Sequence, residues 1–253
     1  MTTTLISTRT HAQAFIDAVR AEASKMWSLP AIWLILAGTL TLTIVLSIAF
    51  GANAQIGPGS SANVLDYGVT AVTWTQCGFF LLGVIAATSE YIGGQIRTTL
   101  VAIPDRTAQR LAATAALVPH AFAAAVVTIV ASITTMLLTT GTDVEQVDLA
   151  LALRITLSAA GYLTLMAVLS SALGFLIRRA IPAAAILLVY LLIVSPFLQG
   201  QNWYFLPDIA SYTLWFATVP DDAPPAAVSW LILFAWTLAF LLPSIIVARR
   251  RDT

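Results

Sequence analysis

The sequence predicts an all-α integral membrane protein with six membrane-spanning helices and with both termini on the cytoplasmic side. Three observations lead to this prediction. Charged residues make up only 9% of the 253 residues and the mean hydropathy is +0.89, whereas soluble domains have about 25% charged residues. Six long stretches carry no charge, and their apolar residues lack the alternation of barrel strands. The basic residues, finally, gather in the segments that would lie on one side of the membrane.

Each uncharged stretch can hold one span, because crossing a hydrocarbon core of ~30 Å takes ~20 helical residues. The Gly-, Asn-, Ser- and Pro-rich run at 51–63 is expected to be a loop after the first span. The expected spans are residues 30–50, 69–88, 113–138, 153–176, 181–198 and 227–247. They form one transmembrane domain over residues 30–248, between an N-terminal segment, 1–29, and a basic tail, 249–253.

The distribution of Lys and Arg orients these spans, because cytoplasmic loops are enriched in both. With a cytoplasmic N-terminus, Arg154 is the only one of the 12 basic residues that lies outside. The acids then expected outside are Asp66, Asp143, Glu145, Asp148, Asp208, Asp221 and Asp222. The opposite orientation would place nearly all basic residues outside, so the sequence predicts cytoplasmic N- and C-termini.

The N-terminal segment has helical periodicity up to Pro30, which separates it from the first span. Phe15, Val19, Ala23, Met26 and Trp27 form an apolar stripe, with Trp27 expected at headgroup depth, and most charged residues lie off it. This pattern indicates a helix at the inner membrane surface. The alternative is a solvated leader with a basic anchor.

The segment between the second and third spans is expected to contain a short amphipathic helix. Ile92, Ile96, Leu100 and Ile103 have the spacing of one helical face, and Pro104 ends it. Such a helix, held beneath the membrane by two spans, is either a lever for a cytoplasmic partner or a loop that covers the membrane surface.

Sequence motifs for most enzyme classes are absent. Lys25 is the only lysine and belongs to no phosphate loop, and there is no nucleophile elbow or Cys/His cluster. We therefore expect no catalytic residue, no metal, no cofactor in this chain and no nucleic-acid partner. His120, beside Pro119 in the third span, is either a functional intramembrane residue or a neutral, packed histidine bonded to a backbone carbonyl freed by the proline.

Three segments carry a family resemblance. Arg20-Ala-Glu22-Ala-Ser-Lys25-Met-Trp-Ser28 precedes the first span, Glu90-x-x-x-Gly94-x-Ile96-Arg97-Thr98-Thr99-Leu100 with Pro104-x-Arg106 follows the second, and 249–252 read Arg-Arg-Arg-Asp. Together they resemble the ABC-2 type permeases, the membrane subunits of ATP-binding-cassette exporters, in the form common in actinobacteria. Thr114 departs from the pattern, because relatives often carry a lysine there.

The resemblance implies that residues 92–106 form a coupling helix that docks on a separate ATPase subunit, and that the leader is a connecting helix with Arg20, Glu22 and Lys25. It also implies interfacial or re-entrant helices in 198–226. The coupling residues would be Glu90, Gly94, Ile96, Arg97, Thr98, Thr99, Leu100, Pro104 and Arg106. The working unit would contain two permeases, either identical or sister chains, and two ATPases whose phosphate loops hold ATP and Mg. It would lie in the bacterial plasma membrane, in contact with membrane lipids.

The function expected on this basis is export of an apolar or amphiphilic compound: a drug, as in multidrug efflux, a peptide or a lipid. Candidate residues of the substrate path are Trp74, Gln76, Phe79 and Phe80 in the second span, His120 in the third, and Tyr190, Ser195 and Phe197 in the fifth. The alternatives are a non-transporting sensor or immunity subunit, which would bind a ligand without ATP, and an intramembrane enzyme.

Overall fold

The computed structural model describes residues 11–54, 63–89, 91, 106–142, 147–199, 201 and 203–249, and these residues form helices and turns without a strand. Within these ranges six helical stretches are long and apolar enough to cross a membrane: Pro30–Asn53, Val64–Thr88, Arg106–Thr140, Leu149–Ile177, Ala180–Leu198 and Ala226–Arg249. Each of the six expected spans lies inside one of these stretches. The chain is therefore an all-helical, multi-pass membrane protein, as the sequence predicts.

Several spans consist of more than one helical element. In chain order the described elements are α1 (His11–Ser28), α2 (Pro30–Asn53), α3 (Val64–Thr75), α4 (Cys77–Thr88), α6 (Arg106–Thr140), α7 (Leu149–Ile177), α8 (Ala180–Val189), the π-helix η3 (Tyr190–Val194), α9 (Ser195–Leu198), α10 (Pro207–Trp215) and α11 (Ala226–Arg249). The second span is α3 and α4, joined at Gln76, and the fifth is α8, η3 and α9.

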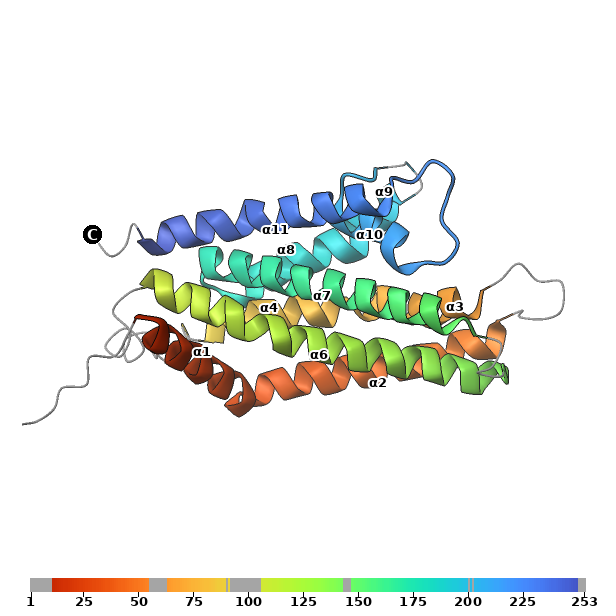
Figure 1. Cartoon of the computed structure of the whole chain (residues 1–253), viewed down its shortest axis with the longest axis horizontal. Coiled ribbons are helices and arrows are strands. Elements are labelled where there is room, and N and C mark those ends of the chain that lie inside the picture. The colour runs from red at the N-terminus through yellow and green to blue at the C-terminus, as the bar shows by residue number, and fades with distance from the viewer. Residues whose placement is uncertain are drawn as a thin grey trace, which may run out of the picture.

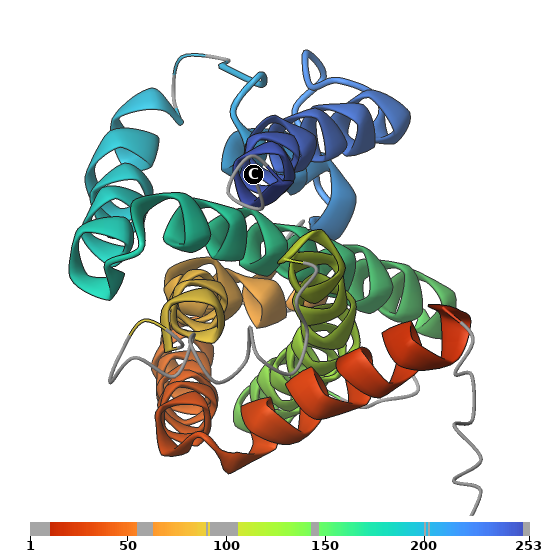
Figure 2. The same ribbon diagram turned by 90° about the vertical axis from the view of Figure 1, so that its left-hand side faces the viewer.

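The centre of the bundle is α7, which packs against α4, α6 and α11. Viewed end-on, α7 lies between α11 on one side and α1, α2, α4 and α6 on the other (Figure 2). Small residues let α4 and α7 approach closely: a Cβ added to Gly83 would lie 2.0 Å from the Ala167 carbonyl oxygen. Close backbone packing at small residues is a main source of helix association in membranes.

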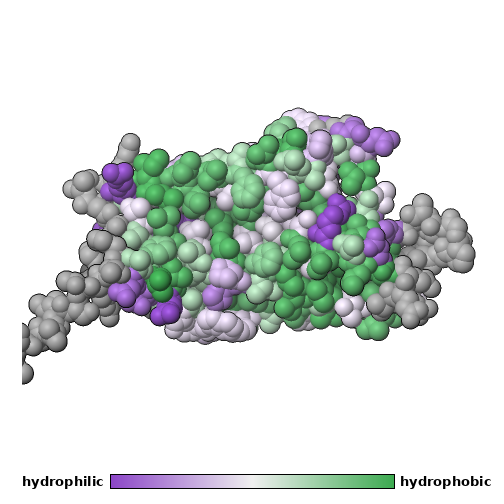
Figure 3. Space-filling view, viewed as in Figure 1, coloured by the Kyte–Doolittle hydropathy of each residue, from purple (hydrophilic) through white to green (hydrophobic). Residues whose placement is uncertain are grey.

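The outer surface of the bundle is apolar. Long aliphatic side chains such as Leu34, Leu138 and Ile181 are exposed, and apolar residues cover most of the face in Figure 3, between hydrophilic residues nearer its two ends. A soluble protein rarely exposes so large an apolar surface. This surface suits contact with lipid chains.

Hydroxyl groups join neighbouring helices inside the bundle. The Thr43 and Thr75 hydroxyls lie 2.6 Å apart across α2 and α3, and those of Ser47 and Ser132 lie 2.8 Å apart across α2 and α6. Three of these hydroxyls also bond to backbone carbonyls of their own helices, as Thr43 does to Thr39, whereas Ser132 in α6 donates to the Gly68 carbonyl of α3. Their polar atoms are thus satisfied without water.

The bundle has two distinct ends, seen in Figure 1. One end, here named the α1 end, holds α1, the start of α6 and the end of α11. The opposite end, the α10 end, holds α10 and the end of α6. Leu29 is extended and Pro30 begins α2, so the chain breaks between α1 and α2 where the sequence predicts.

The packed face of α1 overlaps the apolar stripe expected from sequence in part: Met26 is buried, and Val19 and Ala23 are partly buried against the core. Ala18, Glu22 and Met26 are the buried residues of α1, whereas Phe15 is exposed. Since these three are spaced four residues apart, they form one face, and α1 packs against α6. A carboxylate thus lies at the centre of the face that joins α1 to the bundle.

Candidate functional site

A buried arginine joins three spans at the α1 end. Arg110, in the first turns of α6, is only 3% exposed. Its Nη1 donates to Ser171 Oγ in α7 at 3.0 Å, and its Nε donates to Ser244 Oγ in α11 at 3.3 Å. The guanidinium carbon lies 5.2 Å from the centre of the Phe175 ring, which adds a cation–π contact. One side chain therefore contacts both α7 and α11.

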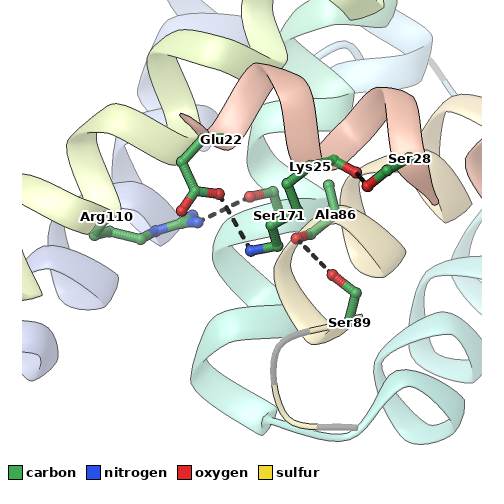
Figure 4. A network of polar contacts seen from close by, with 7 residues as sticks. All are labelled: Glu22, Lys25, Ser28, Ala86, Ser89, Arg110 and Ser171. Carbon is green, nitrogen blue, oxygen red and sulfur yellow. Dashed lines mark hydrogen bonds and ion pairs between the residues drawn. The ribbon is translucent and has the colours of Figure 1, made fainter. Parts of the chain in front are cut away.

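The face of α1 reaches the same region. Lys25 Nζ lies 3.2 Å from Glu22 Oε2, and Glu22 is 7% exposed. In Figure 4 the carboxylate of Glu22 and the guanidinium of Arg110 point into the space between α1, α6 and α7. We name Glu22, Lys25, Arg110, Ser171 and Ser244 the Arg110 cluster. Burial of charge is costly without polar partners, and the two serines give Arg110 such partners where α6, α7 and α11 meet.

The segment between α4 and α6 begins and ends close to this cluster. Tyr91 packs edge-on against Phe175, with ring centres 6.4 Å apart, and Arg178 lies 5.8 Å from the Tyr91 ring centre. Arg106 begins α6, one turn before Arg110. Tyr91, at one end of 92–105, therefore packs on α7, and Arg106, at the other end, begins α6; the contact between Arg110 and Phe175 joins these two helices.

Most of the expected coupling residues cannot be placed from the structure. Arg106 is half-buried at the start of α6; the rest, namely Glu90, Gly94, Ile96, Arg97, Thr98, Thr99, Leu100 and Pro104, lie outside the described residues. Of the expected connecting-helix residues, Glu22 and Lys25 belong to the Arg110 cluster. Arg20 instead points away from it, exposed and 3.9 Å from Asp17.

At the α10 end the fold buries a carboxylate. Asp208, in the first turn of α10, is 3% exposed. Its two oxygens accept hydrogen bonds from the hydroxyls of Tyr190 and Ser195 in the fifth span. The structure thus brings together two of the expected path residues, around an acid of the outer segment 198–226, for which the resemblance implies interfacial or re-entrant helices. The sequence does not predict the burial of this acid.

Further polar groups lie next to this carboxylate. Gln199 Nε2 donates to the Tyr212 hydroxyl at 2.9 Å and reaches Ser195 Oγ at 3.4 Å. Burial, together with the Asp208 carboxylate, raises the pKa of Tyr212 to about 12, so this hydroxyl stays protonated at neutral pH.

The second span contributes a buried polar pair. Tyr162 in α7 donates to Gln76 Oε1 at 2.6 Å, and its ring lies 5.3 Å from that of Trp215 in α10. Gln76 sits at the junction of α3 and α4, where its Nε2 donates to the Thr73 carbonyl at 2.8 Å. The pair joins the second and fourth spans beside α10.

We expect Tyr162→Phe to destabilise the protein, because it leaves the buried Gln76 oxygen without its donor. An unsatisfied buried acceptor costs about 1–3 kcal/mol. Thermal unfolding of the purified protein in detergent measures the effect. Tyr204→Phe is the matched control, since Tyr204 is hydrogen-bonded only at the surface, to Asp222 at 3.3 Å; equal unfolding temperatures for the two variants would contradict the prediction.

Of the other expected path residues, only Phe80 lines a groove together with Tyr190. Phe79 and Phe80 are buried in the core, whereas Trp74 is 57% exposed and Phe197 is 78% exposed. Trp74 and Phe197 therefore face outward from the bundle, where lipid or another chain would contact them. Helical spacing alone could not distinguish these positions, because apolar side chains occur on all sides of these spans.

His120 lies in a separate pocket of about 420 Å³ between α1, α2 and α6, with Trp27, Trp33 and Thr128 among its lining residues. Its ring centre is 5.6 Å from that of Trp27. Nδ1 lies 2.7 Å from the carbonyl oxygen of Ala116, four residues earlier. This is not the bond expected from the sequence, because the carbonyl that Pro119 frees is that of Ala115, four residues before the proline.

No protein-family model matches the chain, and no curated protein is significantly similar to it. Functional inference therefore depends on the two polar sites, at the α1 end and the α10 end, and on the sequence segments described above.

Proposed function

We propose that this chain is the membrane subunit of an ATP-binding-cassette exporter of the ABC-2 type. It would move an apolar or amphiphilic compound across the bacterial plasma membrane, while a separate subunit with a phosphate loop binds ATP and Mg and hydrolyses the nucleotide. The observation that carries the proposal is the Arg110 cluster. Arg110 joins α6 to α7 and α11 close to both attachment points of 92–105, the segment that resembles a coupling helix, and Glu22 and Lys25 of α1 lie beside it (Figure 4).

The proposal needs a physical route from a cytoplasmic partner to the spans. A partner that moves the segment 92–105 would pull on Tyr91 at one end and on the first turn of α6 at the other. Tyr91 packs on Phe175, and Arg110 contacts the same ring. Motion would therefore reach α6, α7 and α11 together. For ATP to drive this motion, the ATPases must bind one arrangement of the spans more tightly than another.

The proposed orientation places the α1 end in the cytoplasm. Most described basic residues lie near this end: Arg106 and Arg110 in the first turns of α6, Arg178 and Arg179 between α7 and α8, and Arg249 at the end of α11. Arg154 lies in the first turns of α7, toward the opposite end. This asymmetry agrees with the positive-inside tendency of membrane proteins.

The first experiment is a mild-detergent pull-down of the tagged chain from its native membrane, followed by mass identification and an ATPase assay. We expect a stoichiometric partner with a phosphate loop. The masses also show whether the complex holds one permease species or two. A chain that comes down alone, without ATP hydrolysis, would contradict the proposal and favour a sensor or immunity subunit.

We further expect Glu90→Ala and Arg97→Ala to uncouple ATP hydrolysis from transport, because Arg97 lies in the proposed docking segment and Glu90 lies two residues before it. Transport per ATP hydrolysed in proteoliposomes should fall by at least about tenfold, which corresponds to about 1.4 kcal/mol of coupling free energy. Arg154→Ala is the matched control at the opposite end of the bundle. Normal coupled turnover in both variants would show that this segment does not couple ATP hydrolysis to transport.

A further inference from the structure

The pocket that contains His120 lies where α1 and α2 meet at an angle beside α6 (Figure 1). Trp27, near the end of α1, and Trp33, near the start of α2, line one side of it. The α6 side is a single face of residues three and four apart, here named the α6 stripe: His120, Ala123, Ala124, Val127 and Thr128. Trp33 is 47% and Val127 57% exposed, so the pocket opens on the outer surface of the bundle, where compounds dissolved in the membrane have access to it.

Aromatic rings line the part of the pocket nearest α1. The ring centres of Trp27 and Trp33 are 5.0 Å apart, and the Trp27 ring meets His120 edge-on at 5.6 Å. Trp33 Nε1 donates to the Trp27 carbonyl at 2.9 Å, which holds this indole in place. Such fixed rings favour a flat aromatic ligand over an alkyl chain, because aromatic pairs attract each other beyond the area that they bury.

His120 supplies a hydrogen-bond acceptor to this pocket. Its Nδ1 lies 2.7 Å from the Ala116 carbonyl oxygen. A carbonyl oxygen only accepts, so Nδ1 carries the proton of the neutral imidazole and Nε2 keeps a lone pair. Within the described part of the chain Nε2 makes no hydrogen bond, and protein atoms do not enclose it. Because the ring itself lines the pocket, this open nitrogen belongs to the small polar part of an otherwise apolar surface.

The other polar side chains of the lining have internal partners for their hydrogens. Trp33 donates to a backbone carbonyl, as described above, and the Thr128 hydroxyl donates to the Ala124 carbonyl at 2.8 Å. No charged residue lines the pocket. A ligand that fits it is therefore neutral and apolar, with one donor for Nε2.

We propose that this pocket binds a flat aromatic compound that carries a hydroxyl group, with the rings between the two tryptophans and the α6 stripe and the hydroxyl donating to His120 Nε2. The inference rests on the proposed function, since it narrows the class of exported compound from apolar and amphiphilic compounds in general to aromatic alcohols of the phenol type.

The size and chemistry of the pocket select for such a ligand. An apolar cavity of roughly 150 Å³ holds one benzene ring, so this pocket of about 420 Å³ has room for about two or three fused rings. A lipid chain has no donor and would leave Nε2 unpaired in an apolar environment, which is unfavourable. A charged ligand would lose its hydration without gaining an opposite charge.

The test compares 2-naphthol with 2-methoxynaphthalene, which keeps the rings and the oxygen but has no hydrogen to donate. Binding to the purified full-length chain in detergent is measured as the part that excess unlabelled probe displaces, so partition into micelles does not count. We expect the wild-type protein to prefer 2-naphthol. His120→Phe should lower the ratio of the two affinities at least about fivefold, as expected for one hydrogen bond, and leave binding of 2-methoxynaphthalene unchanged, because it keeps a ring and removes Nε2.

A second variant tests the place of binding. Ala123→Phe puts a large side chain into the pocket from an exposed position of the α6 stripe, and it should abolish displaceable binding of both probes. Ala115→Phe is the matched control, since Ala115 is an exposed alanine of α6 that does not line the pocket. It should leave the binding of both probes unchanged.

Equal affinity of the wild-type protein for the two probes, or no binding of either, would overturn the proposal; the pocket would then accommodate a lipid chain. An unchanged affinity ratio in His120→Phe would also overturn it. If His120→Phe does not fold, the wild-type preference and its loss in Ala123→Phe decide together. The assay uses no ATPase, so its failure leaves the coupling experiments untouched, and loss of coupling with an intact preference for 2-naphthol contradicts only the exporter proposal.

Discussion

Replacing Arg110 with alanine will strongly destabilise the protein. The change removes hydrogen bonds to Ser171 and Ser244 together with the contact with Phe175. Hydrogen bonds to charged groups contribute about 1.5–3 kcal/mol each, and a cation–π contact adds about 0.5–2 kcal/mol. Because neighbouring interactions are not additive, we expect a total loss of roughly 3–5 kcal/mol, measured as a lower unfolding temperature in detergent.

Two further variants separate the contributions of charge and shape. Arg110→Lys keeps the charge but loses the planar fork that reaches two serines at once, so its stability should lie between those of the wild type and the alanine variant. Arg154→Ala removes an exposed arginine and should have little effect. An unfolding temperature of Arg110→Ala equal to that of Arg154→Ala would show that the cluster does not hold the helices together.

Replacing Gly83 with alanine will also destabilise the protein, although it adds a single methyl group. The new Cβ would lie 2.0 Å from the Ala167 carbonyl oxygen and 3.0 Å from Ser170 Cβ. The oxygen belongs to the backbone of α7, which cannot turn away as a side chain can. The clash is therefore removed only if α4 and α7 move apart. Overpacking of this kind typically costs about 1–3 kcal/mol, and the most buried span of the bundle is affected.

Gly38→Ala is the matched control for this change. A Cβ at Gly38 in α2 has no other atom within 4 Å, and alanine favours a helix over glycine by about 1 kcal/mol. Thermal unfolding of both variants should therefore shift in opposite directions. A Gly83→Ala protein as stable as Gly38→Ala would mean that α4 and α7 tolerate a wider spacing than their packing indicates.

The spans could be predicted from the sequence because their signal is local. An uncharged stretch of sufficient length is visible without knowledge of its neighbours, and the structure has one apolar helix for each of the six. The break at Pro30 is equally local, since proline fixes its own backbone and restricts the residue before it.

The polar sites could not be predicted in this way, because they depend on residues far apart in the sequence. Arg110 and Ser244 are separated by 134 positions, and Tyr190 and Asp208 by 18. In the sequence, Arg110 is one more basic residue near a membrane boundary and Asp208 one more acid in an outer segment. Their burial follows only from how α7, α10 and α11 pack. The π-turn that joins Tyr190 and Ser195 likewise has no recognised signal in their sequence.

The distance along the chain between Arg110 and its partners has a consequence for biosynthesis. Synthesis proceeds from the N-terminus, so α6 is made before α7 supplies Ser171 and long before α11 supplies Ser244. Until α7 is made the guanidinium has neither serine, and until α11 is made it has only Ser171, so its charge stays near the polar membrane surface, where it is hydrated. The arginine can take its final position only after the last helix has been inserted. The Arg110 guanidinium thus becomes buried in the protein when the bundle is completed.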